Sequence, residues 1–238
     1  MARTKEFSPE AALDAAMHLF WLKGYGPTSM RDLLDGMGIG RGSFYDTFGD
    51  KRALFLAVLE RFEEARTGWM DEALEGTGVE GIEEVFRRTV EGMTGSEPRR
   101  GCLLANTAVE LAPRDPEVAD RISRHVRRTE EAFAGALVRA QEMGEIPAGR
   151  DPRSLARFLV SNLHGLRVLA QAGTDRRTLE DVARVALEAL RRGDPPRVDL
   201  AVSHRRDLAC GLRCQPTPAR RAPDPVPDPT GGTGQGRA

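Results

Sequence analysis

Four polar side chains lie close together in one short segment of the chain: Arg41, Ser43, Tyr45 and Thr47. Helical spacing would place the nearby rings of Phe44 and Phe48 on one face of a helix. If that face is buried, the polar side chains point outward. A guanidinium, two hydroxyls and a phenol could then bond to phosphates or to base edges of a nucleic acid. The segment therefore has the chemistry of a helix that contacts DNA.

The surrounding sequence predicts the elements that would position these groups. A short helix is expected from Thr28, as its cap, to Gly38, and a second covers residues 40–48. Two short helices joined by a glycine turn are typical of a helix-turn-helix, whose second helix enters the major groove. Thr28 and Lys51 lie at expected helix N-termini, which favour phosphate. The pattern predicts a DNA-binding regulator rather than an enzyme.

Each candidate residue also has a simpler interpretation. Arg41 is placed to reach a guanine or a phosphate, and the alternative is a solvated arginine near a helix start. Gly42 would let the helix approach the duplex closely, or it is only a turn residue. Ser43 and Thr47 offer hydroxyls that could instead bond to their own backbone. The phenol of Tyr45 reaches a phosphate or caps the core. Lys51 contacts a phosphate or is solvated.

Composition counts modestly against this interpretation. The 238 residues include 35 lysines and arginines and 36 acidic residues, for a net charge of −1. Affinity for DNA must therefore come from the local placement of cations. No apolar run is long enough to span a bilayer, no signal peptide is recognisable, and three cysteines do not make a disulfide scaffold. We expect a cytoplasmic protein with no membrane partner.

Helix signals dominate the chain, and they predict an all-α fold. Ser8 is expected to cap a first helix that ends at Gly24, and Asp50 to cap a long fourth helix that reaches about Ala73 with a buried stripe at Leu54, Val58, Phe62, Ala65 and Trp69. Further helices are expected at about 80–94, 102–112, 115–143, 152–172 and 175–192. The predicted domains are a helix-turn-helix domain over 1–55, a helical effector-binding and dimerisation domain over 56–193, and a disordered tail rich in Pro, Gly and Arg over 194–238.

The last two expected helices have broad apolar faces, which suggest a dimer interface made by a helix pair. Alternatively, these faces complete the core of the monomer. The residues concerned are Leu155, Phe158, Leu159, Asn162, Leu166, Leu179, Val182, Ala186 and Leu190.

From about Ser8 to Phe55 the sequence resembles the TetR family of bacterial transcriptional regulators. The matching segments are Ala15-Ala16, Phe20, Gly24-Tyr25, Thr28-Ser29-Met30-Arg31-Asp32-Leu33, Gly38-Ile39, Gly42-Ser43-Phe44-Tyr45, Phe48-Gly49, Lys51 and Leu54-Phe55. The resemblance implies an all-helical homodimer with an N-terminal operator-binding domain and a C-terminal effector domain. Ser29, within the matching segment, completes the set of candidate DNA-binding residues.

Two glycines depart from the family pattern. Gly40 stands where a polar residue usually caps the third helix, so a cap hydroxyl is missing. Gly36 stands in the last turn of the second helix, where alanine is commoner, and costs up to about 1 kcal/mol of helix propensity. Both departures suggest a domain that becomes more ordered when it binds DNA.

Cys102 is a candidate sensor of electrophiles. The segment Arg100–Glu110 is similar to one in a subset of the family, some of whose members sense electrophiles or oxidants through a cysteine here. A helix N-terminus and the neighbouring Arg99 and Arg100 would favour a reactive thiolate. Alternatively, Cys102 is a small buried hydrophobe. Cys210 and Cys214 form only a loose pair in the tail.

The candidate effector pocket combines apolar residues with a few amides, as small-molecule sites do. Its proposed members are Phe86, Val90, Cys102, Asn106, Phe133, Phe158 and Asn162. His125 lies among arginines and is expected to be solvated, whereas His164 is expected in a pocket or at the dimer seam. No catalytic, metal-binding or cofactor motif is recognisable.

These observations predict a homodimeric repressor that is released from double-stranded operator DNA by a small molecule or an electrophile. Its two recognition helices would lie about 34 Å apart, one turn of DNA. Two other functions remain open. One is a helical small-molecule-binding protein or enzyme with a coincidental helix-turn-helix match. The other is a DNA-binding activator without an effector.

Overall fold

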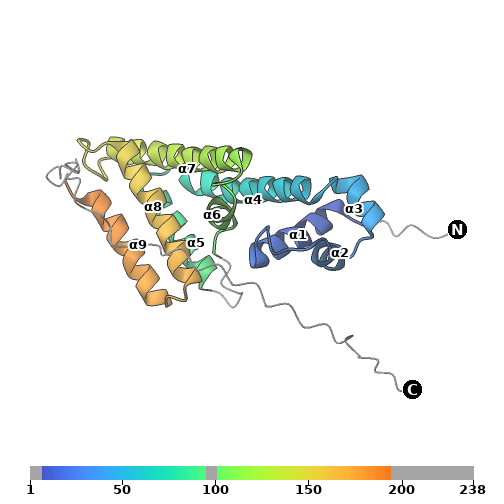
Figure 1. The fold of residues 1–238 in the computed structure, drawn as a ribbon. Helices are drawn as coiled ribbons and strands as arrows, with labels where there is room; N and C mark the ends of the chain where they lie inside the picture. The colour runs from blue at the N-terminus through green and yellow to red at the C-terminus, as the bar shows by residue number, and fades with distance from the viewer. Residues whose placement is uncertain (1–6, 95–100, 194–238) are drawn as a thin grey trace, which may run out of the picture. The chain divides into compact units, whose positions relative to one another are not determined.

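The computed structural model describes residues 7–94 and 101–193, which form nine helices and no strand. The all-α prediction is therefore confirmed for these residues (Figure 1). The predicted tail, with Cys210 and Cys214, lies outside them, as do Arg99 and Arg100. The helices are α1 (Pro9–Lys23), α2 (Met30–Met37), α3 (Arg41–Phe48), α4 (Lys51–Leu74), α5 (Val79–Met93), α6 (Leu103–Glu110), α7 (Pro116–Glu142), α8 (Pro152–Gln171) and α9 (Arg176–Arg191).

Local signals set most helix ends. The Ser8 side chain accepts a hydrogen bond from the Ala11 N–H at the start of α1, and Gly24 ends this helix with a φ of 85°. The Asp50 carboxylate caps α4 by accepting from the N–H of Ala53. These predictions are confirmed, because caps and glycine turns depend on residues only a few positions apart.

The predicted cap of α2 is wrong by one residue. Ser29 is the N-cap and forms a capping box with Asp32, in which each side chain accepts from the other residue's backbone N–H. Thr28 is buried instead, and its hydroxyl donates to the Gly24 carbonyl oxygen at 2.6 Å. Ser29 and Thr28 are both good capping residues, so the sequence alone did not distinguish them.

The first core positions the helix-turn-helix. Buried residues of α1, α2 and α3 pack against the N-terminal half of α4, with the rings of Phe20 and Phe55 5.0 Å apart edge to face. The packing of α1 against α2 explains the glycine at position 36, since a Cβ atom there would lie 2.6 Å from Cδ1 of Leu19 on α1. The glycine that weakens α2 as a helix thus lets α1 and α2 approach closely.

The second core joins the C-terminal end of α4 to α5, α7, α8 and α9. Most of the apolar residues predicted to form a dimer interface lie inside it, among them Leu155, Leu159, Leu166, Leu179, Ala186 and Leu190. Phe158 is different, with 42% of its surface exposed. Six of the nine predicted interface residues therefore complete the core of their own chain, which was the alternative interpretation.

The buried stripe of α4 follows the prediction only in its first half. Leu54, Val58 and Phe62 are buried as expected, but Ala65 is exposed and Trp69 is only half-buried. Met70 and Leu74 provide the contact with the second core instead. The stripe changes direction because α4 packs against different helices at its two ends.

Gly81 makes a close contact that predicts a stability difference. A Cβ atom at this position of α5 would lie 2.3 Å from the Ala73 backbone oxygen, whereas at Gly92 on the same helix it would meet nothing within 4 Å. We expect Gly81→Ala to lower the free energy of unfolding by about 1–3 kcal/mol through overpacking. Gly92→Ala should instead raise it by up to about 1 kcal/mol. Chemical denaturation measures both, and equal effects would contradict the close contact.

Candidate functional site

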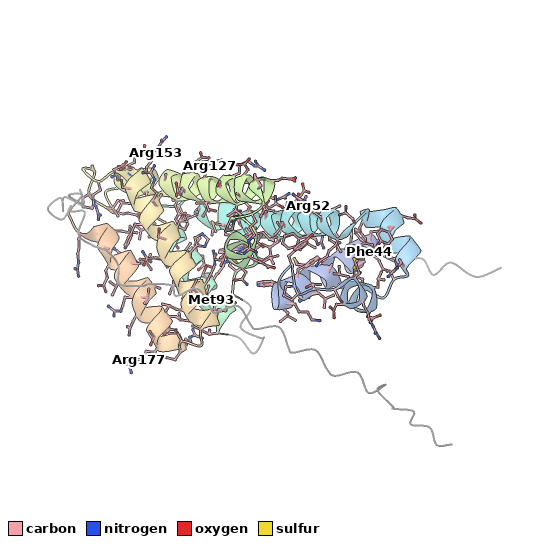
Figure 2. The ribbon with its side chains drawn as sticks, in the orientation of Figure 1. Phe44, Arg52, Met93, Arg127, Arg153 and Arg177 are labelled. Carbon is pink, nitrogen blue, oxygen red and sulfur yellow. The ribbon has the colours of Figure 1, made fainter. Side chains whose placement is uncertain are left out.

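The exposed face of α3 is built on one buried ring. Phe44 is fully buried, and its ring contacts those of Tyr45 and Phe48 at 5.4 and 6.0 Å between centroids (Figure 2 labels Phe44). Tyr45 remains 48% exposed, and Arg41, Gly42 and Thr47 are also exposed, while Ser43 is half-buried. The helix therefore presents the predicted polar groups on its outer side.

Arg41 is available for a ligand. It lies at the first position of α3, after the N-cap Gly40, which provides no side-chain hydrogen bond. No residue in the described part of the chain forms an ion pair with it, unlike Arg31 on α2, whose Nε lies 3.5 Å from a carboxylate oxygen of Asp35. An exposed guanidinium at the start of a recognition helix suits a base edge or a phosphate.

Three other candidates are already engaged within the chain. Thr28 is buried, and the Ser29 hydroxyl donates to Asp32 at 2.6 Å. Lys23, 2.6 Å away, and Ser29 hold the pKa of Asp32 below its usual range. Lys51 is half-buried, with its Nζ 4.5 Å from the centroid of the Tyr25 ring. Burial lowers the pKa of Lys51, and Glu110 opposes this shift. A phosphate would have to compete with these contacts.

Glu110, which sequence analysis did not single out, links α6 to the helix-turn-helix. Its carboxylate accepts hydrogen bonds from the backbone N–H groups of Tyr25 at 3.0 Å and Gly26 at 2.6 Å, in the turn between α1 and α2. Glycines make room for it, because a Cβ atom at Gly24 would lie 2.8 Å from Oε2. We call this contact the Glu110 clasp. No local pattern signals it, since its partners are 84 and 85 residues away.

A second contact between the two parts lies at the start of α7. Arg52 on α4 donates to Glu117 at 2.8 Å and forms an ion pair with the N-cap residue Asp115 at 2.9 Å. The Glu110 clasp and this ion pair connect α6 and α7 to residues around the helix-turn-helix. Side-chain contacts thus join both helices to the DNA-binding end.

The predicted effector residues do not form one pocket. Phe86, Val90 and Phe133 belong to the second core, and Cys102 belongs to the first. Phe158 points outward, and Asn162 donates to its backbone oxygen at 2.8 Å. Asn106, on α6, is half-buried. The prediction of a shared pocket is therefore corrected, because helical spacing could not assign these residues to different cores.

Phe86 and Val90 do line a groove of about 350 Å³ between α5 and α9. Ala183 and Leu187 complete its apolar floor. Ion pairs cross its rim, including one of 2.7 Å between Arg191 and Glu83. The groove is a shallow surface feature rather than an enclosed ligand cavity.

Cys102 is the N-cap residue of α6 and is buried in the first core. It packs with Leu103 and Leu104 in a cluster that also contains Phe62 of α4. This position fits the interpretation of Cys102 as a packed hydrophobe and places it at the opposite end of α6 from the Glu110 clasp.

His125 is not the solvated residue that its arginine neighbours suggested. Burial lowers the pKa of both His125 and His164 to about 4, and the charge of Arg167 adds to the shift. Both imidazoles are therefore neutral at pH 7. Among the described residues, no group of His, Cys, Asp and Glu side chains is arranged to hold a metal ion. No helix in the same part of the chain is long and apolar enough to cross a membrane.

Two family models cover the two parts of this architecture. The model described as bacterial regulatory proteins of the tetR family matches residues 12–58, and that of the tetracyclin repressor-like C-terminal domain matches residues 78–186. The HTH-type transcriptional regulator YezE of Bacillus subtilis strain 168 is 36% identical over 193 residues, which cover 80% of this chain and all of YezE.

The chain belongs to the TetR family. The HTH-type transcriptional repressor ComR of Escherichia coli K12 is 32% identical, over 78% of this chain and 90% of ComR. A cysteine mutant of the TetR family regulator CifR, solved with 26 bp double-strand operator DNA, is 32% identical with a TM-score of 0.71, over 79% of this chain and 99% of that one. The family and these relatives confirm a DNA-binding transcriptional regulator rather than an enzyme.

The Glu110 clasp predicts a stability effect. Glu110→Gln should lower the free energy of unfolding by about 1–2 kcal/mol, because a neutral amide accepts less strongly and leaves one of two backbone N–H groups poorly paired. Glu72→Gln, at an exposed position of α4, is the control and should change stability by less than about 0.5 kcal/mol. Thermal unfolding measures both. Equal stability of the two variants would show that the clasp contributes nothing.

Proposed function

We propose that this TetR-family protein is a ligand-responsive repressor that binds double-stranded operator DNA as a homodimer. Residues 1–55 would read the DNA, and residues 56–193 would bind the effector and form the dimer. The observation that carries the proposal is the outer face of α3, where Arg41 and Tyr45 are exposed above a fully buried Phe44. The repressor ComR and the operator complex of CifR support it.

The contacts expected at the DNA follow from this geometry. Arg41, at the first position of α3, is placed for a base edge or a phosphate, and the Tyr45 phenol for a phosphate. Gly42, Ser43 and Thr47 complete this face of the helix. The Lys51 ammonium contributes only if phosphate replaces its contact with the Gly26 carbonyl oxygen, which is 3.5 Å away.

Dimerisation would use the apolar residues that the second core leaves exposed. On α8 these are Phe158, Val168 and Leu169, and on α9 Val185. Phe158 and Val168 are ten residues apart, or nearly three helical turns, with Ser161 and Gly165 exposed between them. A stripe of this kind suits a helix pair packed against its copy.

The response to an effector would run through α6 and α4. Helix α6 has Cys102 at one end and the Glu110 clasp at the other, so a ligand that moves its first turn also moves the turn between α1 and α2. Helix α4 contributes to both cores. An effector that favours one arrangement of these helices would shift the population toward dimers whose two recognition helices no longer match the operator.

An activator without an effector is the remaining alternative. A mobility-shift assay with DNA from upstream of the protein's own gene, combined with transcription in vitro from the same fragment, separates the two. Repression relieved by a small molecule supports the proposal. Increased transcription, unaffected by any effector tested, would favour the activator.

Substitutions on α3 test the recognition helix. Arg41→Ala should weaken binding by about 1–3 kcal/mol if it reads a base, with reduced discrimination between sequences. Tyr45→Phe should weaken binding to all sequences alike if the phenol bonds to a phosphate. Arg177→Ala, an exposed arginine on α9, is the control. Mobility shifts at several salt concentrations measure each variant. Wild-type affinity for both α3 variants, with helicity intact, would exclude this face.

Charges on the exposed apolar stripe test the dimer. Val168→Asp combined with Val185→Asp should dissociate it and abolish operator binding, since both side chains are nearly 60% exposed in the single chain. Val109→Asp, on the exposed side of α6, is the control and should remain dimeric. Leu166 does not suit this test because it is fully buried in its own core. Sedimentation velocity gives the oligomeric state, and an intact dimer in the double variant would refute this interface.

A further inference from the structure

Five residues from four helices form a basic cluster in the effector part of the chain, in which Cys102 and Arg167 are buried and the other three are half-buried. It consists of Arg66 on α4, Cys102 at the start of α6, His125 on α7, and His164 and Arg167 on α8. Arg167 is only 6% exposed. Helix α7 packs against both α4 and α8, which brings these residues together. The charges of Arg66 and Arg167 lower the pKa of both imidazoles, and the charge of Arg167 lowers the pKa of Arg66.

The two guanidiniums of the basic cluster have no acidic partner among the described residues. The Nε atoms of Arg66 and Arg167 are both buried without a hydrogen-bond partner. Among the described residues, the Arg66 guanidinium contacts the ring of Trp69, and the Cζ atom of Arg66 lies 5.5 Å from the ring centroid. Buried arginines are normally paired, because removing a charge from water is costly unless a counter-charge compensates.

Neighbouring arginines show that the chain supplies carboxylates elsewhere. Arg121 on α7 pairs with Glu63 at 3.0 Å. Glu63 lies on α4, one turn before Arg66. Arg128, next to the basic cluster on α7, pairs with Asp71 at 3.0 Å. These two acids are thus engaged by other arginines, and what distinguishes Arg66 and Arg167 among the arginines of the described residues is a buried Nε atom without a hydrogen-bond partner.

We propose that the basic cluster binds the anionic group of a small molecule, a carboxylate or another oxyanion such as a phosphate or sulfate. The guanidinium forks provide charged N–H donors in the geometry that suits an oxyanion. The neutral imidazoles of His125 and His164 can each donate one more hydrogen bond. An anion would satisfy the unpaired donors and compensate the buried charge.

This inference rests on the proposed function in one respect, which is that the bound molecule would be the effector. The basic cluster touches the first turn of α6 through Cys102 and contacts α4 through Arg66. Both helices contact the helix-turn-helix, so an anion placed here would act on both.

Histidine pKa values give a direct test without DNA. The chain has four histidines. In protein labelled in the imidazole rings, the NMR signals of His125 and His164 are assigned by replacing each histidine in turn with asparagine. The protein is titrated with sodium sulfate or sodium formate against sodium chloride at equal ionic strength. A bound anion should raise both pKa values from about 4, because it offsets the guanidinium charges.

Variants locate the binding. Arg167→Gln should abolish the anion-induced shift of His125, whereas Arg153→Gln, an exposed arginine on the same helix, should retain it. A response to sulfate alone indicates a phosphate-like or sulfate-like group, and a response to formate alone indicates a carboxylate; both support the proposal. Identical titrations in sulfate, formate and chloride would overturn it, as would an unchanged shift in Arg167→Gln. If Arg167→Gln does not fold, the wild-type titration decides alone.

Operator binding separates this inference from the proposed function. Failure of the unliganded protein to bind operator DNA would refute the proposed function and leave the anion titration unaffected. An absent titration response with intact operator binding would refute only the basic cluster as an anion site.

Discussion

Helix α4 is the constraint on which the rest of the structure depends, because it is buried in two different cores. Leu54, Val58 and Phe62 fix its first half against the helix-turn-helix, and Met70 and Leu74 fix its end against α5 and α7. Close packing resists changes in either core without a compensating change in the other. A single continuous helix is therefore a suitable connection between an effector domain and a DNA-binding domain.

Charge is used in opposite ways at the two ends of α6. At its C-terminal end, the Glu110 carboxylate accepts two backbone N–H groups and stabilises the turn between α1 and α2. At its N-terminal end, two guanidiniums of the basic cluster remain unpaired within the described residues. The first charge is satisfied within the chain, whereas the Nε atoms of the second group have no hydrogen-bond partner among the described residues. The proposed anion would therefore act at the N-terminal end of α6 and leave the Glu110 clasp in place.

The recognition face shows how stability and function are divided within one short helix. Phe44 provides the burial that fixes α3, so Arg41 and Tyr45 need no internal partner of their own. The weak cap at Gly40 and the tight contact at Gly36 lie on either side of the turn. The exposed residues of α3 are consequently free to be matched to an operator without affecting the core.

The sequence by itself determined the all-α fold, the helix-turn-helix and the outward direction of Arg41 and Tyr45, because caps, glycine turns and helical spacing act over a few residues. Only the tertiary structure decided that Thr28 is buried, that Leu166 belongs to the core of its own chain, and that Glu110 reaches Gly26. It likewise brought Arg66 and Arg167 together from positions a hundred residues apart. Which face of a helix is covered, and by what, depends on long-range packing, and hydrophobic periodicity alone does not specify the partner.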